Sequence, residues 1–136
     1  MKDKVFVDSN VWLYLFLPFE TNKNKIANEF ILEKASQSIF ISYQVINEVT
    51  NQLLRNKLDE NKVKVCIEYI YEICTIHNFS KEIIMLASTL RERYTFSFWD
   101  SIITASALNS GCNTLVTEDM HDGLKIENMI IKNIFK

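Results

Sequence analysis

The sequence predicts an α/β fold in which a mostly parallel sheet lies between two layers of helices. Short apolar runs recur along the 136 residues, amphipathic helical segments separate them, and 48% of the residues are hydrophobic. Strands that alternate with helices require right-handed crossovers, which cover both faces of a parallel sheet with helices. Because the chain has only two glycines and one proline, we expect no linker and a single domain over residues 1–136.

The expected strands are the short runs rich in apolar and β-branched residues. The first, residues 5–7, ends abruptly at Asp8, and residues 39–41 form a second buried strand. Residues 75–78 are expected at an edge of the sheet, and residues 113–117 and 129–131 supply the last two strands. Each strand is short enough to lie in the core of a small three-layer α/β/α sandwich.

The helices are predicted from apolar periodicity and from residues that favour helix ends. The expected helices are residues 11–16, 22–35, 43–55, 59–74, 80–94 and 99–110. Residues 8–10 have the types that cap a following helix, and Pro18 stops that helix. Ser42 is expected to cap the helix that carries Glu48, and Gly111 to form a left-handed cap after residue 110.

Charge and composition limit the class of protein. The net charge of −2 argues against a broad basic surface that would hold nucleic acid through many phosphate contacts. The three cysteines are an odd number without C-x-x-C spacing, so neither a disulfide framework nor a zinc site is expected. The sequence shows no signal peptide and no apolar run of membrane-spanning length, so we expect a cytoplasmic protein with no membrane partner.

Four acidic residues occupy positions that favour a shared site. Asp8 and Asp119 follow the carboxyl ends of predicted parallel strands, the edge where open α/β sheets bind ligands. Asp100 lies in the first turn of a helix that can reach the same edge, and Glu48 joins only through tertiary folding. Converging carboxylates repel one another unless a cation neutralises them, and oxygen ligands favour Mg²⁺ or Mn²⁺. This pattern predicts metal-assisted hydrolysis of a phosphodiester.

The segments 7–10, 98–107 and 117–120, together with Glu48 on a middle helix, resemble PIN domains over nearly the whole chain. The sequence is most similar to the single-domain VapC-like toxins of bacterial toxin–antitoxin pairs. This resemblance implies a Mg²⁺-dependent endoribonuclease (or one that uses Mn²⁺), an RNA substrate, a homodimer, and a cognate antitoxin that neutralises the toxin.

The resemblance also implies roles for individual residues. The family's acidic quartet, catalytic and metal-binding, corresponds to Asp8, Glu48, Asp100 and Asp119, with Asp8 and Asp100 as the direct metal ligands. The hydroxyl residues that orient these acids correspond to Ser9 and Thr117. Glu118 and Asp122 flank Asp119, so the sequence leaves open which of the three faces the metal. Candidates for substrate contacts are Arg55, Arg91, Arg93 and His121, although the arginines also suit helix C-termini.

Two other functions remain open at this stage. An aspartyl-phosphate phosphotransferase would also place an aspartate such as Asp8 after its first strand. Enzymes of that kind carry a second aspartate two residues later, where this chain has Asn10. A non-catalytic PIN-like interaction module would keep the fold and bind only a partner or RNA, and a complete acidic quartet argues against it.

Overall fold

The computed structural model describes residues 3–18, 21–35 and 38–136, and within these residues the strands form one six-stranded sheet. The strand order is β3-β2-β1-β4-β6-β5, and every neighbouring pair is parallel except β5 and β6. The strands are β1 (Lys4–Val7), β2 (Ser38–Ser42), β3 (Cys74–His77), β4 (Thr114–Val116), β5 (Lys125–Ile126) and β6 (Met129–Lys132). This mostly parallel sheet confirms the predicted fold class.

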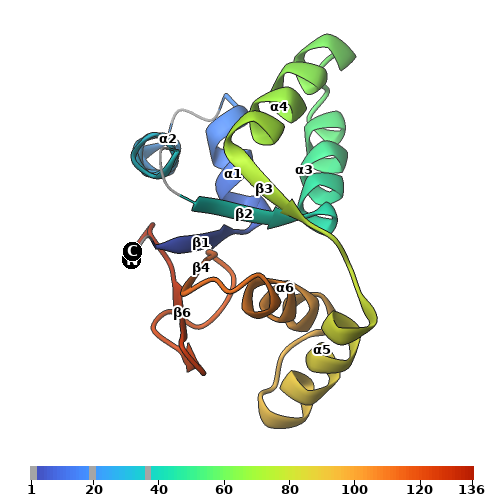
Figure 1. Cartoon of the computed structure of the whole chain (residues 1–136). Coiled ribbons are helices and arrows are strands. Elements are labelled where there is room, and N and C mark those ends of the chain that lie inside the picture. The colour runs from blue at the N-terminus through green and yellow to red at the C-terminus, as the bar shows by residue number, and fades with distance from the viewer. Residues whose placement is uncertain (1–2, 19–20, 36–37) are drawn as a thin grey trace.

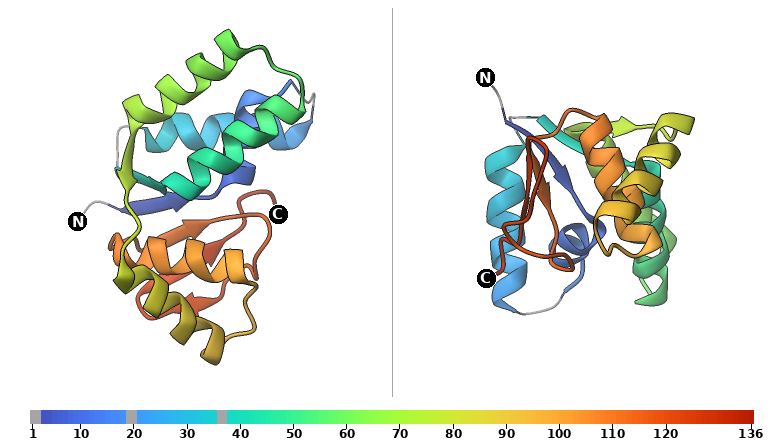
Figure 2. Two further views of the ribbon diagram at one scale, coloured as in Figure 1. Left: turned by 90° about the vertical axis from the view of Figure 1, so that its right-hand side faces the viewer. Right: turned by 90° about the horizontal axis from the view of Figure 1, so that it is seen from below.

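Helices cover both faces of the sheet, as Figure 1 and the left view of Figure 2 show. The first layer contains α1 (Ser9–Phe16), α2 (Asn22–Lys34), α3 (Tyr43–Arg55) and α4 (Glu60–Ile73). The opposite layer contains α5 (Lys81–Arg93) and α6 (Phe98–Asn109). The chain steps outward from β1 to β3 and then returns past β1 to β4, so right-handed crossovers place the two groups of helices on opposite faces.

The central strands and α6 form the buried middle of the molecule. Phe6 and Val7 of β1 have no exposed surface, and Trp12 of α1 is fully buried with its indole Nε1 donating to the Val7 carbonyl at 3.2 Å. Seven consecutive residues of α6, from Ser101 to Ala107, are buried. Because most of these side chains are small, α6 can lie close to the sheet and bring its N-terminus to the carboxyl edge of the strands.

The predicted elements agree with the structure except at two places. The strand expected at residues 129–131 is β6, but β5 was not predicted, because two residues are too few to show an alternating pattern. Ser42 precedes α3 as expected, but its side chain makes no capping hydrogen bond to the helix. Gly111 has φ +77°, so the predicted left-handed cap after α6 is confirmed. Within the described residues, no helix is long and apolar enough to cross a membrane.

Candidate metal centre

The pairing of β1 with β4 brings two distant segments together at the carboxyl edge of the sheet. Val7 pairs with Val116, so Asp8 and Thr117 follow neighbouring strands at the same level. The backbone N–H of Asp8 donates to the Val116 carbonyl at 3.0 Å, which continues the sheet to the first residue of the site. The first acidic residue therefore sits on rigid backbone rather than on a free loop.

Asp8 is a buried carboxylate whose two oxygens are both held. Only 6% of the residue is exposed. Its Oδ1 accepts from the Ser9 backbone N–H at 2.7 Å, and its Oδ2 accepts from the Thr117 hydroxyl at 2.8 Å. Burial raises the pKa of Asp8; these hydrogen bonds oppose the rise, while the charges of Asp119 and Asp100 add to it. Asp8 is thus fixed in orientation and lies in the field of other acids.

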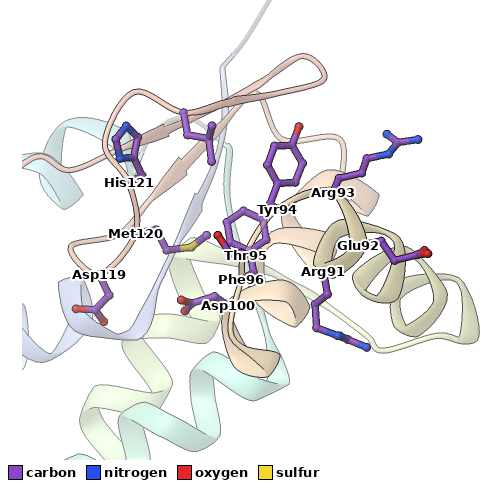
Figure 3. Close-up of a pocket in the computed structure, with 11 residues that line it drawn as sticks. Arg91, Glu92, Arg93, Tyr94, Thr95, Phe96, Asp100, Asp119, Met120 and His121 are labelled. Carbon is purple, nitrogen blue, oxygen red and sulfur yellow. The ribbon is translucent and has the colours of Figure 1, made fainter.

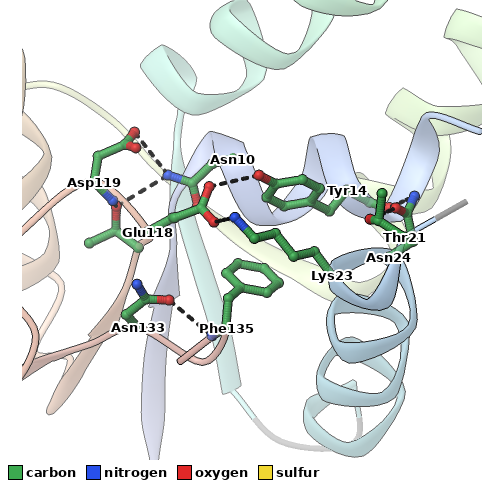
Figure 4. Close-up of polar contacts among 10 residues, drawn as sticks. Asn10, Tyr14, Thr21, Lys23, Asn24, Glu118, Asp119, Asn133 and Phe135 are labelled. Atoms are coloured by element: carbon green, nitrogen blue, oxygen red, sulfur yellow. Dashed lines mark hydrogen bonds and ion pairs between the residues drawn. The ribbon is translucent and has the colours of Figure 1, made fainter. Parts of the chain in front are cut away.

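Asn10 ties the turn after β4 to the start of α1 (Figure 4). Its Nδ2 donates to Asp119 Oδ2 at 3.1 Å and to Thr117 Oγ1 at 3.3 Å, and its Oδ1 accepts from the Glu118 backbone N–H at 3.3 Å. The Thr117 hydroxyl also accepts from the backbone N–H of Asp119 at 3.2 Å. One side chain therefore positions a second acidic residue relative to Asp8.

The structure separates the roles of the three acidic residues in this turn. Glu118 accepts from the Tyr14 hydroxyl at 2.8 Å and forms an ion pair with Lys23, so its carboxylate is directed to α1 and α2 (Figure 4). Asp122 accepts from the backbone N–H of Asn133 at 2.8 Å. Asp119 instead lies near Asp8 and Asp100, and its charge raises the pKa of each. Asp119 is therefore the member of the three that lies toward Asp8 and Asp100.

Asp100 and Glu48 complete the cluster from the two helical layers. Burial and the charge of Asp119 raise the pKa of Asp100, while a hydrogen bond with Ser97 lowers it. Glu48 on α3 is exposed, yet the protein around it and then the charge of Asp8 raise its pKa to about 7. Asp100 and Asp119 also raise it. The four predicted acids thus lie in one electrostatic field, and we call them the acidic cluster.

The donor chemistry of the acidic cluster fits a divalent cation, although the side chains are not closed around one point. In the part of the chain that the structure describes, no three His, Cys, Asp or Glu side chains form a group that could hold a metal ion as they stand. The cluster offers only carboxylate oxygens, which Mg²⁺ and Mn²⁺ prefer. Glu48 and Asp119 are exposed, and Asp119 is held by a single side-chain hydrogen bond from Asn10, whereas Asp8 is buried and fixed, so closure requires movement of the exposed members.

A cavity of about 650 Å³ opens beside the acidic cluster (Figure 3). Asp100 and Asp119 line it together with three of the predicted substrate-contact residues, Arg91, Arg93 and His121. Arg91 donates through Nη1 to the Ser101 hydroxyl at 2.7 Å, and in Figure 3 both arginine side chains point away from the two acids. Arg55 lies in the last turn of α3 and is not among the residues that line this cavity.

The chain matches the PIN domain family over residues 5–121 and belongs to that family. Membership implies nuclease chemistry in general, and PIN nucleases generally use divalent metal ions. The use of divalent metal ions in this family is consistent with a cluster of carboxylates at the carboxyl edge of the sheet.

Solved structures share this fold at low sequence identity. A toxin–antitoxin complex from Klebsiella pneumoniae has a chain with a TM-score of 0.77 and 20% identity, over 98% of this chain and 99% of that one. VapC20 of Mycobacterium tuberculosis, a toxin that cleaves the sarcin–ricin loop, has a TM-score of 0.67 and 16% identity, over 82% of this chain and 87% of that one. DNA-bound VapBC of Salmonella typhimurium has a chain with a TM-score of 0.73 and 16% identity, over 97% of this chain and 98% of that one. A comparison with curated proteins found no match.

Three residues at the site, Asn10, Lys23 and Gln44, had no role in it predicted from the sequence. Asn10 was part of the motif that carried the resemblance, and its position two residues after Asp8 was the available signal. Lys23 forms an ion pair with Glu118 and directs its carboxylate away from the acidic cluster. Gln44 lies one helical turn before Glu48 on α3. The contact of Lys23 with Glu118 depends on how α2 packs and does not follow from local sequence patterns, whereas the i, i+4 spacing of Gln44 and Glu48 in the predicted helix was an available signal.

Proposed function

We propose that this chain is a metal-dependent endoribonuclease, the toxin of a toxin–antitoxin pair. The observation that carries the proposal is the acidic cluster at the carboxyl edge of the sheet, where burial and the charges of neighbouring acids raise the pKa of Asp8, Glu48 and Asp100. Desolvated carboxylates that repel one another are costly to keep, so their convergence favours a function that uses a cation.

Each acid has a distinct part in the proposed hydrolysis. Asp8 and Asp100 are the proposed direct ligands of Mg²⁺ or Mn²⁺, which supplies an activated water and stabilises charge on the phosphate. Asp119, held by Asn10, and Glu48 complete the ligand set. Glu48, whose pKa is raised to about 7 in the metal-free protein, is the member of this set proposed as the general base. Thr117 holds Asp8 in place through the hydrogen bond to Oδ2, and Ser9 does so through its backbone N–H.

The proposed partners follow from the relatives. Several similar folds were solved as toxin–antitoxin complexes, which supports an antitoxin partner for this chain. RNA is the proposed substrate because VapC20 is a toxin that cleaves the sarcin–ricin loop. A homodimer, a cytoplasmic location and a single domain over residues 1–136 remain parts of this proposal. Arg91, Arg93 and His121 are the proposed substrate contacts of the larger cavity, and Arg55 is a proposed contact outside it.

The direct test is RNA cleavage by the purified chain with Mg²⁺ or Mn²⁺, with EDTA as the metal-free control. Asp8→Asn should abolish cleavage because the amide removes the buried negative charge. Asp122→Asn is the matched control, since Asp122 accepts a backbone hydrogen bond away from the cluster and the variant keeps that acceptor. Equal cleavage by the unsubstituted chain and Asp8→Asn would refute the proposal and indicate a contaminating nuclease.

A non-catalytic interaction module is the second candidate. It is favoured by the finding that, among the described residues, no three potential ligands form a metal-holding group as they stand. Calorimetric titration with Mn²⁺ separates the two candidates. Binding that disappears in Asp8→Asn and Asp100→Asn supports the nuclease, whereas no such binding supports the module. The phosphotransferase is not favoured, because Asn10, where a second aspartate would be needed, is occupied in holding Thr117 and Asp119.

A further inference from the structure

A second cavity, of about 310 Å³, adjoins the acidic cluster on the side of α3. Four of its lining residues follow helical spacing on one face of α3, and two aromatic residues come from other segments. The lining residues are Gln44, Asn47, Glu48, Asn51, Phe79 and Trp99. Glu48 belongs to both the cavity and the acidic cluster, and Trp99 immediately precedes Asp100. Whatever occupies this cavity therefore lies next to the proposed site of cleavage.

Gln44 lines the cavity with an amide that lacks a protein partner. The residue is only 6% exposed, and neither Nε2 nor Oε1 has a hydrogen-bond partner among the described residues. The amide is close enough to Glu48 to lower the pKa of that carboxyl, but it does not reach hydrogen-bond geometry with it. A buried amide without partners costs folding free energy. Because both amide atoms of Gln44 are covered, the side chain must change rotamer to donate to and accept from a ligand in the cavity.

The aromatic residues of this cavity are exposed. Trp99 is 62% exposed and Phe79 is 45% exposed, although both are large and apolar. The ring of Phe98 packs edge-on against Trp99, with centroids 5.0 Å apart and an interplanar angle of 84°, which supports the indole from one side. The cavity thus combines flat apolar surface with three carboxamide side chains that can donate and accept hydrogen bonds.

Charge distinguishes what each cavity can bind. Of the described residues that line the smaller cavity, none is basic and Glu48 is acidic, so an anion such as phosphate is disfavoured there. The larger cavity, by contrast, contains Arg91, Arg93 and His121. A nucleobase is neutral and flat, stacks on aromatic rings, and presents donors and acceptors along its edge. Carboxamide side chains read such edges through paired hydrogen bonds.

We propose that the smaller cavity binds one unstacked base of a single-stranded RNA beside the cleavage site. In this arrangement the base stacks on Trp99, and Gln44, with its neighbours Asn47 and Asn51, hydrogen-bonds the edge of the base. The sugar–phosphate backbone then passes the acidic cluster toward the arginine-lined cavity. This inference rests on the proposed ribonuclease function and adds to it a specificity pocket for a single nucleotide.

The test uses Trp99 as its own reporter in the full chain. RNA octamers of A, C, G or U, and an octamer of abasic sites, are titrated in Mg²⁺ into protein carrying Asp8→Asn, which prevents cleavage. Because Trp12 is fully buried, a change in tryptophan fluorescence on binding reports on Trp99. We expect the base-containing octamers to quench this fluorescence and the abasic octamer to leave it nearly unchanged.

Substitutions then distinguish stacking from edge recognition. Because the Trp99 variants lack the Trp99 signal, the affinity of every variant is measured from the anisotropy of dye-labelled octamers. Trp99→Ala should weaken octamer binding about 10-fold, in line with the loss of one stacked base, and Trp99→Phe should weaken it less. Gln44→Ala should reduce the differences in affinity among the four octamers. Tyr71→Ala, which removes an exposed aromatic residue of α4, is the matched control and should bind as the parent does.

The outcomes separate failure of this pocket from failure of the nuclease proposal. If RNA binds and Trp99→Ala matches Tyr71→Ala in affinity, the base pocket is wrong while the nuclease proposal stands. If the unsubstituted chain neither binds nor cleaves RNA, the nuclease proposal fails first. If Trp99→Ala leaves RNA affinity unchanged but disrupts the oligomer in sedimentation, the surface is a protein contact and the base pocket is overturned.

Discussion

Replacing Glu48 with glutamine should stabilise the metal-free protein at alkaline pH while it removes activity. The folded protein raises the pKa of Glu48 from 4.5 to about 7, so the fold binds this proton more tightly than the unfolded chain does. The stability that the protonated form contributes is present below pH 4.5 and is lost as the pH rises through about 7. Glutamine imitates the protonated form at every pH, so Glu48→Gln escapes this loss.

The size of the effect follows from the pKa and from the exposure of the side chain. At about 1.4 kcal/mol per pKa unit, the change in pKa sets a ceiling of about 3 kcal/mol. Because Glu48 is exposed, solvent screening reduces the expected difference to roughly 1–2 kcal/mol. Urea denaturation in EDTA should therefore give similar stabilities for the parent and Glu48→Gln at pH 5, and a parent less stable by this amount at pH 8.

Two controls make the stability experiment decisive. Glu29→Gln changes an exposed glutamate on α2 that does not contribute to the pKa of Glu48, and its stability should parallel the parent at both pH values. Added Mg²⁺ should stabilise the parent more than Glu48→Gln at pH 8, because the cation relieves repulsion that the variant lacks. If Glu48→Gln and the parent lost stability equally between pH 5 and pH 8, the acids would not be coupled and the metal-site argument would fail.

Substitutions at four further positions test how the acids are positioned. Thr117→Val removes the buried hydroxyl that donates to Asp8; we expect a loss of about 1.5–3 kcal/mol in urea denaturation, with Thr117→Ser close to the parent. Asn10→Ala releases Asp119 and should lower kcat about 10-fold while costing no more than about 1 kcal/mol of stability. Glu118→Gln should leave RNA cleavage within about twofold, whereas Asp119→Asn should lose most of it, since only Asp119 faces the cluster. Equal losses of RNA cleavage in Glu118→Gln and Asp119→Asn would contradict the assignment of Asp119 to the acidic cluster.

Much of the fold was predictable because its signals are local. Each parallel strand was expected within about two residues of its position, since a short apolar run between helical segments is visible in sequence. The ends of α1 and α6 followed from a capping aspartate at Asp8 and from Gly111, whose effects reach only adjacent residues. Strand β5 was missed because it is only two residues long and its pairing is set by the fold.

The site, like the fold, has positions that local sequence signals predict and positions that only the tertiary structure shows. The sequence alone predicted Asp8 as a helix cap after the first strand and Asp100 in the first turn of a helix, because both positions depend on local strand and helix ends. Only the tertiary structure decided between Glu118, Asp119 and Asp122. That choice depends on Lys23 and Tyr14, which lie in other helices and bind Glu118 across the fold.

Glu48 and Asn10 show why local patterns could not go further. The hydrogen bond from Asn10 to Thr117 spans 107 residues and exists because β1 pairs with β4. Glu48 lies near Asp8 only because α3 begins at the carboxyl edge directly after β2 and packs against α1, and its raised pKa depends on that packing. Periodicity and capping act over a few residues, whereas the field in the acidic cluster is a sum over segments that strand pairing and helix packing bring together.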